Sequence, residues 1–224
     1  MKRASEVIAK ELLSLSERAP SEDEIVAREL ERELEARAAR GQAYSAAFLK
    51  ALPEAIVHAP MATFERTRGN EQAYRLAMNL KPGESMLLHG SPGIGKTHLA
   101  VLAAHRLSRD HGARAHFWVW PELVARLRDW RNTDRAPSIS SPDVLVVDDF
   151  DKGAVTEFVY ERAYDILQRV MRNQTTIVTT NRDPARTAMR FGMGDRENTE
   201  AFVSRFRLFR SAGITGKDRR APRA

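Results

Sequence analysis

The chain has 224 residues, of which 42% are hydrophobic, and it carries a formal net charge of +6 at pH 7. This length accommodates one α/β domain with a small accessory region, and the hydrophobic content is ordinary for a protein that buries a core. Because cysteine is absent, disulfides, thiolate zinc sites and cysteine nucleophiles are excluded. The basic balance is compatible with a nucleic-acid partner, although a basic surface also serves solubility alone.

Charged residues interrupt the beginning of the chain. Residues 1–15 include Lys2, Arg3, Glu6, Lys10 and Glu11, a pattern that is typical of neither a signal peptide nor a membrane span. No other run of the sequence approaches spanning length. We therefore expect a cytoplasmic location and no membrane partner.

Residues 1–58 are predicted to form a helical region that is distinct from the rest of the chain. Helices are expected over residues 5–17, 21–40 and 43–52. The second helix begins with a capping box, in which Ser21 and Glu24 bond each other's backbone. Gly41 is its expected end, and a linker is expected to run from Pro53 through Pro60.

The second of these helices has a narrow apolar stripe on a highly charged surface. Three apolar residues recur at four-residue spacing: Val26, Leu30 and Leu34. The stripe fits equally well a helix packed on its own neighbour and a docking face for a partner protein.

From residue 59 onward, helix-like and strand-like segments alternate. Helices are predicted over 71–79, from the glycine-rich loop to about 109, over 122–130 and over 158–172. Strands are predicted over 85–89, 116–120, 143–149 and 175–181, with a short last strand near 208–214. Such alternation indicates an α/β fold with a parallel sheet that helices cover on both faces.

Residues 90–97 read Gly-Ser-Pro-Gly-Ile-Gly-Lys-Thr, between a predicted strand and a predicted helix. The spacing of glycine, four residues and Gly-Lys-Thr predicts a loop whose backbone N–H groups hold phosphate oxygens at a helix N-terminus. Lys96 supplies charge for the β- and γ-phosphates, and the Thr97 hydroxyl is suited to Mg²⁺. We expect nucleotide contacts from Gly90, Ser91, Pro92, Gly93, Ile94, Gly95, Lys96, Thr97 and His98.

Two later strands end in polar residues that can serve a bound triphosphate. Asp148 and Asp149 follow an apolar strand, so Asp148 is predicted to hold Mg²⁺ and Asp149 to orient the attacking water. The alternative for this pair is helix capping. Asn181 ends the next strand, where its amide can bond the γ-phosphate or the water; a turn-forming role is its alternative.

Arg205 is flanked by apolar residues near a predicted helix end. An arginine that reaches a neighbouring subunit's γ-phosphate stabilises transition-state charge there. A surface arginine whose neighbours pack inward is the alternative.

These motifs, in this order, resemble those of AAA+ ATPases, and more narrowly those of the DnaC/DnaI-type helicase loaders and their IstB relatives. The resemblance covers about residues 60–220 and depends on the ensemble of segments 61–65, 70–73, 95–100, 147–150, 204–206 and 216–220. It implies an α/β P-loop NTPase fold with a minimal C-terminal lid, in which residues 59–224 form the ATPase domain. It also implies that Lys96, Asp149, Asn181 and Arg205 act in ATP hydrolysis, with Asn181 as first sensor and Arg205 acting in trans.

By the same resemblance, the protein binds ATP and Mg²⁺, self-associates through ATP at subunit boundaries, and hydrolyses ATP slowly as a switch. A loader would hold a hexameric replicative helicase through its N-terminal helices and would place it on single-stranded DNA. An IstB-type transposition helper has nearly the same core motifs. A non-hydrolysing adaptor is the third alternative, and the presence of Asp148, Asn181 and Arg205 argues against it.

The resemblance also marks an insertion and two departures. Segment 121–135 lies where loaders insert an extra helix, and it carries residues suited to phosphate contact and base stacking: Arg126, Arg128, Trp130, Arg131 and Arg135. An amphipathic surface helix is the alternative. Asp149 stands where many AAA+ enzymes have glutamate, which suggests looser positioning of water. Little length remains for a lid, so the second sensor is unassigned, with Arg220 as a candidate. The absence of cysteine excludes the zinc module that some loaders carry.

Overall fold

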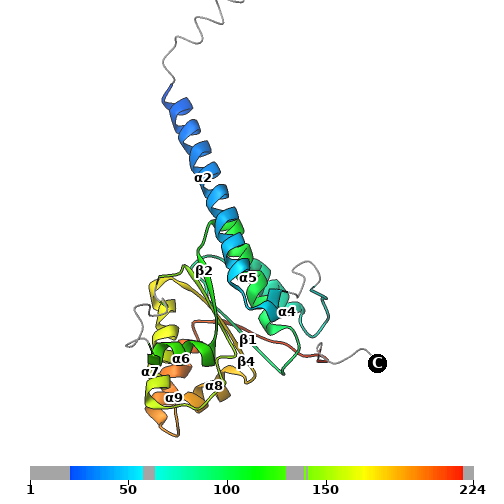
Figure 1. Cartoon of the computed structure of the whole chain (residues 1–224), viewed down its shortest axis with the longest axis vertical. Coiled ribbons are helices and arrows are strands. Elements are labelled where there is room, and N and C mark those ends of the chain that lie inside the picture. The colour runs from blue at the N-terminus through cyan, green and yellow to red at the C-terminus, as the bar shows by residue number, and fades with distance from the viewer. Residues whose placement is uncertain (1–20, 58–63, 130–138, 140, 219–224) are drawn as a thin grey trace, which may run out of the picture. The chain divides into compact units, whose positions relative to one another are not determined.

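The computed structural model describes residues 21–57, 64–129, 139 and 141–218 (Figure 1). The chain divides into two compact units, Met1–Arg37 and Ala38–Ala224. The described part of the first unit is the beginning of helix α2 (Glu22–Ala51), and the second unit holds the α/β fold. Within the described ranges, no helix is long and apolar enough to cross a membrane.

The second unit is built on one parallel sheet with strand order β2-β3-β4-β1-β5. Its strands are β1 (Met86–His89), β2 (Ala115–Val119), β3 (Val144–Asp148), β4 (Thr175–Thr180) and β5 (Arg210–Gly213). The helices that follow α2 are α3 (Glu54–Val57), α4 (Glu71–Asn79), α5 (Lys96–His111), α6 (Trp120–Asp129), α7 (Glu157–Gln168), α8 (Pro184–Phe191) and α9 (Arg196–Phe206), with a 3₁₀ turn at Arg169–Arg172. The expected α/β parallel sheet is therefore confirmed.

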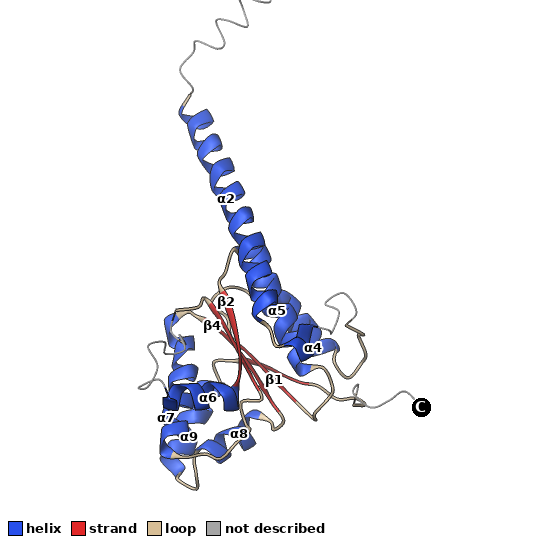
Figure 2. Ribbon diagram, in the orientation of Figure 1, coloured by secondary structure: helices blue, strands red, loops and turns tan. Residues whose placement is uncertain are grey.

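Helices cover both faces of this sheet, as Figure 2 shows. Strand residues alternate between two buried clusters: Leu88 and Val146 face α4 and α5, whereas Leu87 and Val147 face α6, α7 and α9. Strands buried on both sides are expected to be apolar throughout, which explains the Val-Leu-Val-Val run of β3. The carboxyl ends of β1, β3 and β4 are left to carry polar residues.

Local capping fixes several helix ends as the sequence suggests. Gly112 adopts a left-handed conformation (φ 63°) after α5, where its N–H bonds the carbonyls of the last turn. Thr156, Asp183 and Asp195 accept backbone N–H groups at the starts of α7, α8 and α9. Helix α8, which was not predicted, carries both an aspartate cap and a proline at its first position, a standard start signal.

The expected stop at Gly41 is wrong, because α2 continues through Gly41 to Ala51 as one helix. Gly41 is buried, and a Cβ added there would overlap the Arg109 carbonyl and lie 3.2 Å from the Ser108 carbonyl. The glycine therefore serves a close helix–helix approach rather than a helix end. Gly41, Ser45 and Phe48 form the buried face of α2, and Phe48 joins the α5 core.

Other predicted boundaries shift by a few residues. Trp120, expected at the end of β2, starts α6 instead, and its ring is buried against Phe150 and Phe191. The helix expected over 158–172 ends at Gln168 and continues as the 3₁₀ turn. The helix expected over 5–17 lies outside the described residues, as do Trp130, Arg131, Arg135 and Arg220.

Arg169 in the 3₁₀ turn is a wholly buried cation that fixes the start of β3. Its guanidinium donates to the carbonyls of Ile139 and Pro142, the latter at 2.8 Å, and to the Thr176 hydroxyl at 3.2 Å. Burial lowers the pKa of Arg169 to about 10. Oxygen acceptors from the β3 approach and from β4 thus compensate the buried charge, since a buried polar group is costly unless it is hydrogen-bonded.

Replacing Gly41 by alanine tests the close approach of α2 to α5. In an exposed helix interior this change stabilises by up to about 1 kcal/mol, but here the new methyl group would meet backbone atoms of α5. We expect the free energy of unfolding to fall by about 1–3 kcal/mol, measured by urea denaturation. The exposed neighbour Gln42, changed to alanine, is the control, and a stabilised Gly41→Ala variant would contradict the packing.

Candidate nucleotide-binding site

The phosphate loop, residues 90–97, joins β1 to α5 and has the backbone shape that its glycines predict. Gly90, Gly93 and Gly95 have φ values of 141°, 75° and 98°, which side-chain-bearing residues rarely adopt. Gly95 is the residue before α5, so the N-terminus of that helix opens directly from the loop. A helix N-terminus with glycine-permitted turns before it is suited to binding phosphate.

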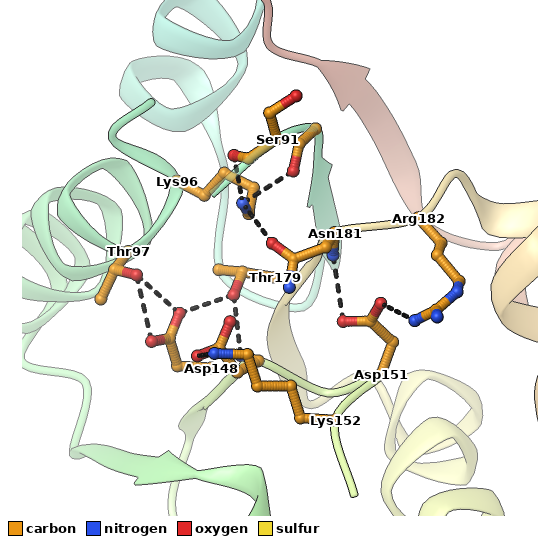
Figure 3. Close-up of polar contacts among 11 residues, drawn as sticks. Ser91, Lys96, Thr97, Asp148, Asp151, Lys152, Thr179, Asn181 and Arg182 are labelled. Atoms are coloured by element: carbon orange, nitrogen blue, oxygen red, sulfur yellow. Dashed lines mark hydrogen bonds and ion pairs between the residues drawn. The ribbon is translucent and has the colours of Figure 1, made fainter. Parts of the chain in front are cut away.

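Lys96 is buried, with its ammonium group folded back onto the loop (Figure 3). Nζ donates to the carbonyls of Gly90 and Ser91, each at 2.8 Å, and to Oδ1 of Asn181 at 2.9 Å. The structure therefore brings Lys96 and Asn181 together, although 85 residues separate them in sequence. To reach phosphate oxygens, the ammonium must exchange some of these acceptors for the ligand.

The Thr97 hydroxyl and the Asp148 carboxylate meet at the foot of the loop. Thr97 Oγ1 lies 2.9 Å from Oδ1 and 3.0 Å from Oδ2 of Asp148, to which it donates a hydrogen bond. Thr179 Oγ1 also donates to Oδ1 of Asp148, at 2.5 Å. Thr179 was not expected in the site. Its place follows from the register of the strands, because Val147 of β3 pairs with Val178 of β4. The hydroxyl at the next position of β4 then adjoins Asp148.

Burial raises the pKa of the Asp148 carboxyl, an effect that the Thr179 hydrogen bond opposes and the charge of Asp149 reinforces. A cation beside Asp148 would offset the cost of burying the charged form. A hydroxyl and a carboxylate fit Mg²⁺, which usually takes one or two carboxylates together with waters and substrate phosphates. Thr97 and Asp148 are therefore the residues that would hold the ion.

Asp149 lies beside this pair but is engaged elsewhere. It has a left-handed conformation (φ 56°), and its N–H donates to Thr179 Oγ1 at 3.0 Å. Its carboxylate forms an ion pair with Lys152 at 2.8 Å. Lys152, like Thr179, was missed by the sequence analysis; the three-residue spacing Asp149-x-x-Lys152 was the available signal.

Asp151 is a further residue that the sequence analysis missed, and its carboxylate hydrogen-bonds the backbone of Asn181. Its side chain is wholly buried, and it accepts the N–H of Asn181 at 3.0 Å and the guanidinium of Arg182 at 2.7 Å (Figure 3). The loop after β3 thus sets the position of Asn181, the residue that directly follows β4. No local pattern in the sequence distinguishes Asp151 from a solvent-exposed loop aspartate.

The remaining predicted nucleotide contacts lie in or beside the loop. Ser91 and Pro92 are exposed, whereas Ile94 is buried in the core under α5. The His98 ring meets the edge of Phe64, with ring centroids 5.3 Å apart.

Arg205 lies on α9 against Tyr164 of α7, within a different set of contacts from Lys96 and Asp148. Its guanidinium donates to the Tyr164 hydroxyl at 2.6 Å and lies 5.1 Å from the centre of that ring. Its neighbours Phe202 and Phe206 are buried, as the alternative of a surface arginine with inward-packing neighbours expects, although Arg205 itself is half-buried; a role in trans stays a proposal.

Helix α6 occupies the described part of segment 121–135, and two of its arginines stack on aromatic rings. The Arg126 guanidinium lies 5.1 Å from the ring centre of Trp118, and that of Arg128 lies 5.6 Å from that of Phe158. Leu123, Val124 and Leu127 form the buried face of the helix. The described part of the segment, residues 121–129, is therefore amphipathic and helical, with basic residues on its exposed side.

Changing Arg182 to alanine tests the support of Asn181 by Asp151. This change leaves a buried carboxylate without one hydrogen-bond donor, so we expect the free energy of unfolding to fall by about 1–3 kcal/mol. Asp151→Asn should cost less, because its amide oxygen still accepts the Asn181 N–H while Arg182, partly exposed, turns to water. Urea denaturation measures both. Arg186→Ala, at a largely exposed arginine one turn on, is the control, and equal stability of Arg182→Ala and this control would contradict the assignment.

Comparison with known proteins agrees with this geometry. The family described as IstB-like ATP binding protein matches residues 6–214. A putative ATP-binding protein in an insertion sequence of Mycobacterium tuberculosis is 31% identical over 112 residues, which cover 47% of this chain and 43% of that protein. The match thus spans less than half the length of this curated relative.

Two solved structures share the fold. The DnaC helicase loader has a TM-score of 0.60 and 24% identity, covering 73% of this chain and all of that one. DnaI has a TM-score of 0.61 and 25% identity, with coverage of 75% and 94%. With its phosphate loop, its Asp148 strand and a family match along most of its length, the chain belongs to the IstB-like ATP-binding proteins, which have the AAA+ P-loop fold of the helicase loaders.

Proposed function

We propose that this protein is an ATP-switched helper of DNA transposition, of the kind encoded in insertion sequences. The observation that carries the proposal is the family match over residues 6–214, together with a relative that is named for its insertion sequence. In this proposal, ATP is bound at a boundary between subunits, DNA and a transposase are engaged in the ATP-bound state, and hydrolysis releases them.

The contacts within the site support this use of ATP. Lys96 would exchange its bonds to the Gly90 and Ser91 carbonyls for β- and γ-phosphate oxygens while Asn181 stays beside it. Thr97 and Asp148 would hold Mg²⁺, which neutralises charge on the phosphates. Asp149 directly follows Asp148 in the chain, and its carboxylate would orient the attacking water.

Slow turnover is the expected consequence of the contacts of Asp149. Its carboxylate is paired with Lys152 at 2.8 Å, so it must leave this partner, or share it, before it accepts a proton. Aspartate is also one methylene shorter than the glutamate of many AAA+ enzymes. Both features suit a protein that uses ATP as a timer, with hydrolysis stimulated by assembly or DNA.

Loading of a replicative helicase is the second candidate, supported by the shared fold of the DnaC helicase loader and DnaI. The two candidates differ in which protein the N-terminal helices hold. The exposed apolar stripe of α2, formed by Val26, Leu30 and Leu34, is the proposed contact in either case, with a transposase in the first and a hexameric helicase in the second.

Capture of partners from native extract distinguishes the two functions. We expect the protein, loaded with a slowly hydrolysed ATP analogue, to retain a transposase, identified by mass spectrometry. Recovery of a replicative helicase instead would favour the loader. Leu30→Glu with Leu34→Glu should abolish capture while ATP binding is kept, since both side chains are exposed.

Lys96→Ala should weaken ATP binding about tenfold or more, and unchanged affinity would refute the loop assignment.

Arg205→Ala tests catalysis in trans. If Arg205 reaches a neighbouring subunit's ATP, the variant keeps ATP binding but its assembly-dependent hydrolysis falls by about 10³-fold, measured by phosphate release. Tyr164→Phe is the matched control, because it removes the hydroxyl that Arg205 bonds and keeps the ring. Equal reductions of stability and hydrolysis in the two variants would instead show that the arginine acts through packing.

Charge reversal on α6 tests the proposed interaction with single-stranded DNA. Arg126→Glu with Arg128→Glu should reduce the slope of log affinity against log salt by about 0.7 for each phosphate that the variant no longer neutralises, as measured by fluorescence anisotropy. Arg196→Glu, on the exposed side of α9, is the matched control for a charge change elsewhere. An unaltered slope in the α6 variant would exclude a role in DNA binding for these arginines.

A further inference from the structure

The segment that follows β5, residues 214–218, runs along the phosphate loop. The Ile214 N–H donates to the carbonyl of His89, the last residue of β1, at 2.8 Å. The Thr215 N–H donates to the carbonyl of Gly69, just before α4, at 2.9 Å. Two backbone hydrogen bonds therefore fix the beginning of this C-terminal segment beside the loop.

Three glycines lie in close contact with the segment, Gly69, Gly90 and Gly93. A Cβ added at Gly90 would overlap the Ile214 carbonyl, and one added at Gly69 would overlap the Thr215 carbonyl and lie 2.7 Å from its hydroxyl. No side chain fits between the segment and these positions. The close approach is thus a property of the folded backbone and not of flexible side chains.

The last described residue of the segment places a carboxylate on the loop itself. A Cβ added at Gly93 would overlap Oδ1 and Cγ of Asp218 and would lie 2.7 Å from Oδ2. The Asp218 carboxylate therefore packs directly on the α-carbon of Gly93, in the middle of the loop that binds phosphate. An anion is favoured there by the N-terminus of α5 and by Lys96.

We propose that Asp218 is an intramolecular competitor for the phosphate loop, and that the C-terminal segment swings away from Gly93 when a nucleoside triphosphate binds. The proposal rests on the nucleotide site described above and adds a determinant of its affinity. A carboxylate and a polyphosphate of like charge repel each other when both lie on one loop. A bound triphosphate must therefore displace the Asp218 carboxylate, or the repulsion between the two lowers the affinity for the triphosphate.

Gly216 is the expected hinge for this movement. Its φ is 154°, and a Cβ added there would meet no atom within 4 Å, so the backbone is open at this point. Ile214 and Thr215, on the sheet side of Gly216, keep their hydrogen bonds to His89 and Gly69. Lys217 and Asp218, on the other side, can then move without disturbing β5.

A different role for Asp218 would have the opposite consequence. If its carboxylate held the loop in a shape that is ready for nucleotide, or offered an acceptor to a ribose hydroxyl, its removal would weaken binding. The sign of the change in affinity therefore decides between competition and support.

Calorimetric titration of the Asp218→Asn variant with ATP·Mg²⁺ and with ADP measures this sign. We expect binding of ATP to tighten about two- to fivefold, the range of an exposed charge interaction, and the gain to shrink in high salt. Asp110→Asn is the matched control: it removes the same charge near the opposite end of α5 from the loop. Unchanged or weaker binding by Asp218→Asn would overturn the competition. Wild-type protein that gives no heat with ATP would overturn the nucleotide site itself and this proposal with it.

A second measurement follows the segment directly. Because the chain has no cysteine, Lys217→Cys introduces a single thiol that can carry an environment-sensitive fluorophore. Saturating ATP·Mg²⁺ should change its emission in the protein with Asp218 and change it less in the Asp218→Asn background, where the carboxylate no longer holds the segment on the loop. An emission that ATP leaves unchanged with Asp218 in place would refute the movement.

Discussion

The register between β3 and β4 is the constraint on which the site depends. Val147 lies opposite Val178, so Asp148 and Thr179 become neighbours at the carboxyl edge of the sheet. β4 also pairs with β1, which carries the phosphate loop. One parallel arrangement of three strands therefore brings Lys96 to Asn181 and Thr97 to Asp148, as expected for ligand sites of open α/β sheets. A slip of one residue along β3 would turn Asp148 to the other face.

The charged groups of this site each have hydrogen-bond or ion-pair partners within the protein. Lys96 donates to two loop carbonyls and to Asn181, Asp148 accepts two threonine hydroxyls, and Asp149 is paired with Lys152. A phosphate group and a metal ion bound here would have to replace several of these contacts, which would reduce the net gain in free energy on binding. Such a moderated affinity would suit the proposed function, in which the protein also releases its nucleotide.

The parts of the site that sequence analysis could predict are those carried by local pattern. The loop at residues 90–97 and the apolar strand before Asp148 each have a signature within a few residues. Thr179 and Asp151 could not be selected, because their roles arise from strand register and from a turn that the sequence does not specify, whereas Lys152 had its spacing from Asp149 as a signal. Gly41 shows the same limit, since its packing on α5 depends on Arg109, far along the chain, and not on its neighbours.

The buried guanidinium of Arg169 has a consequence at the far end of the strand that it anchors. It holds the approach to β3 through carbonyls of Ile139 and Pro142 and through β4, without any contribution from ligand. β3 is five residues long and buried throughout, so an anchor at its start also determines where its last side chain stands. The carboxylate of Asp148 is consequently pre-organised, so a metal ion held there, as proposed, would meet a ligand already in position and would require little ordering of the chain.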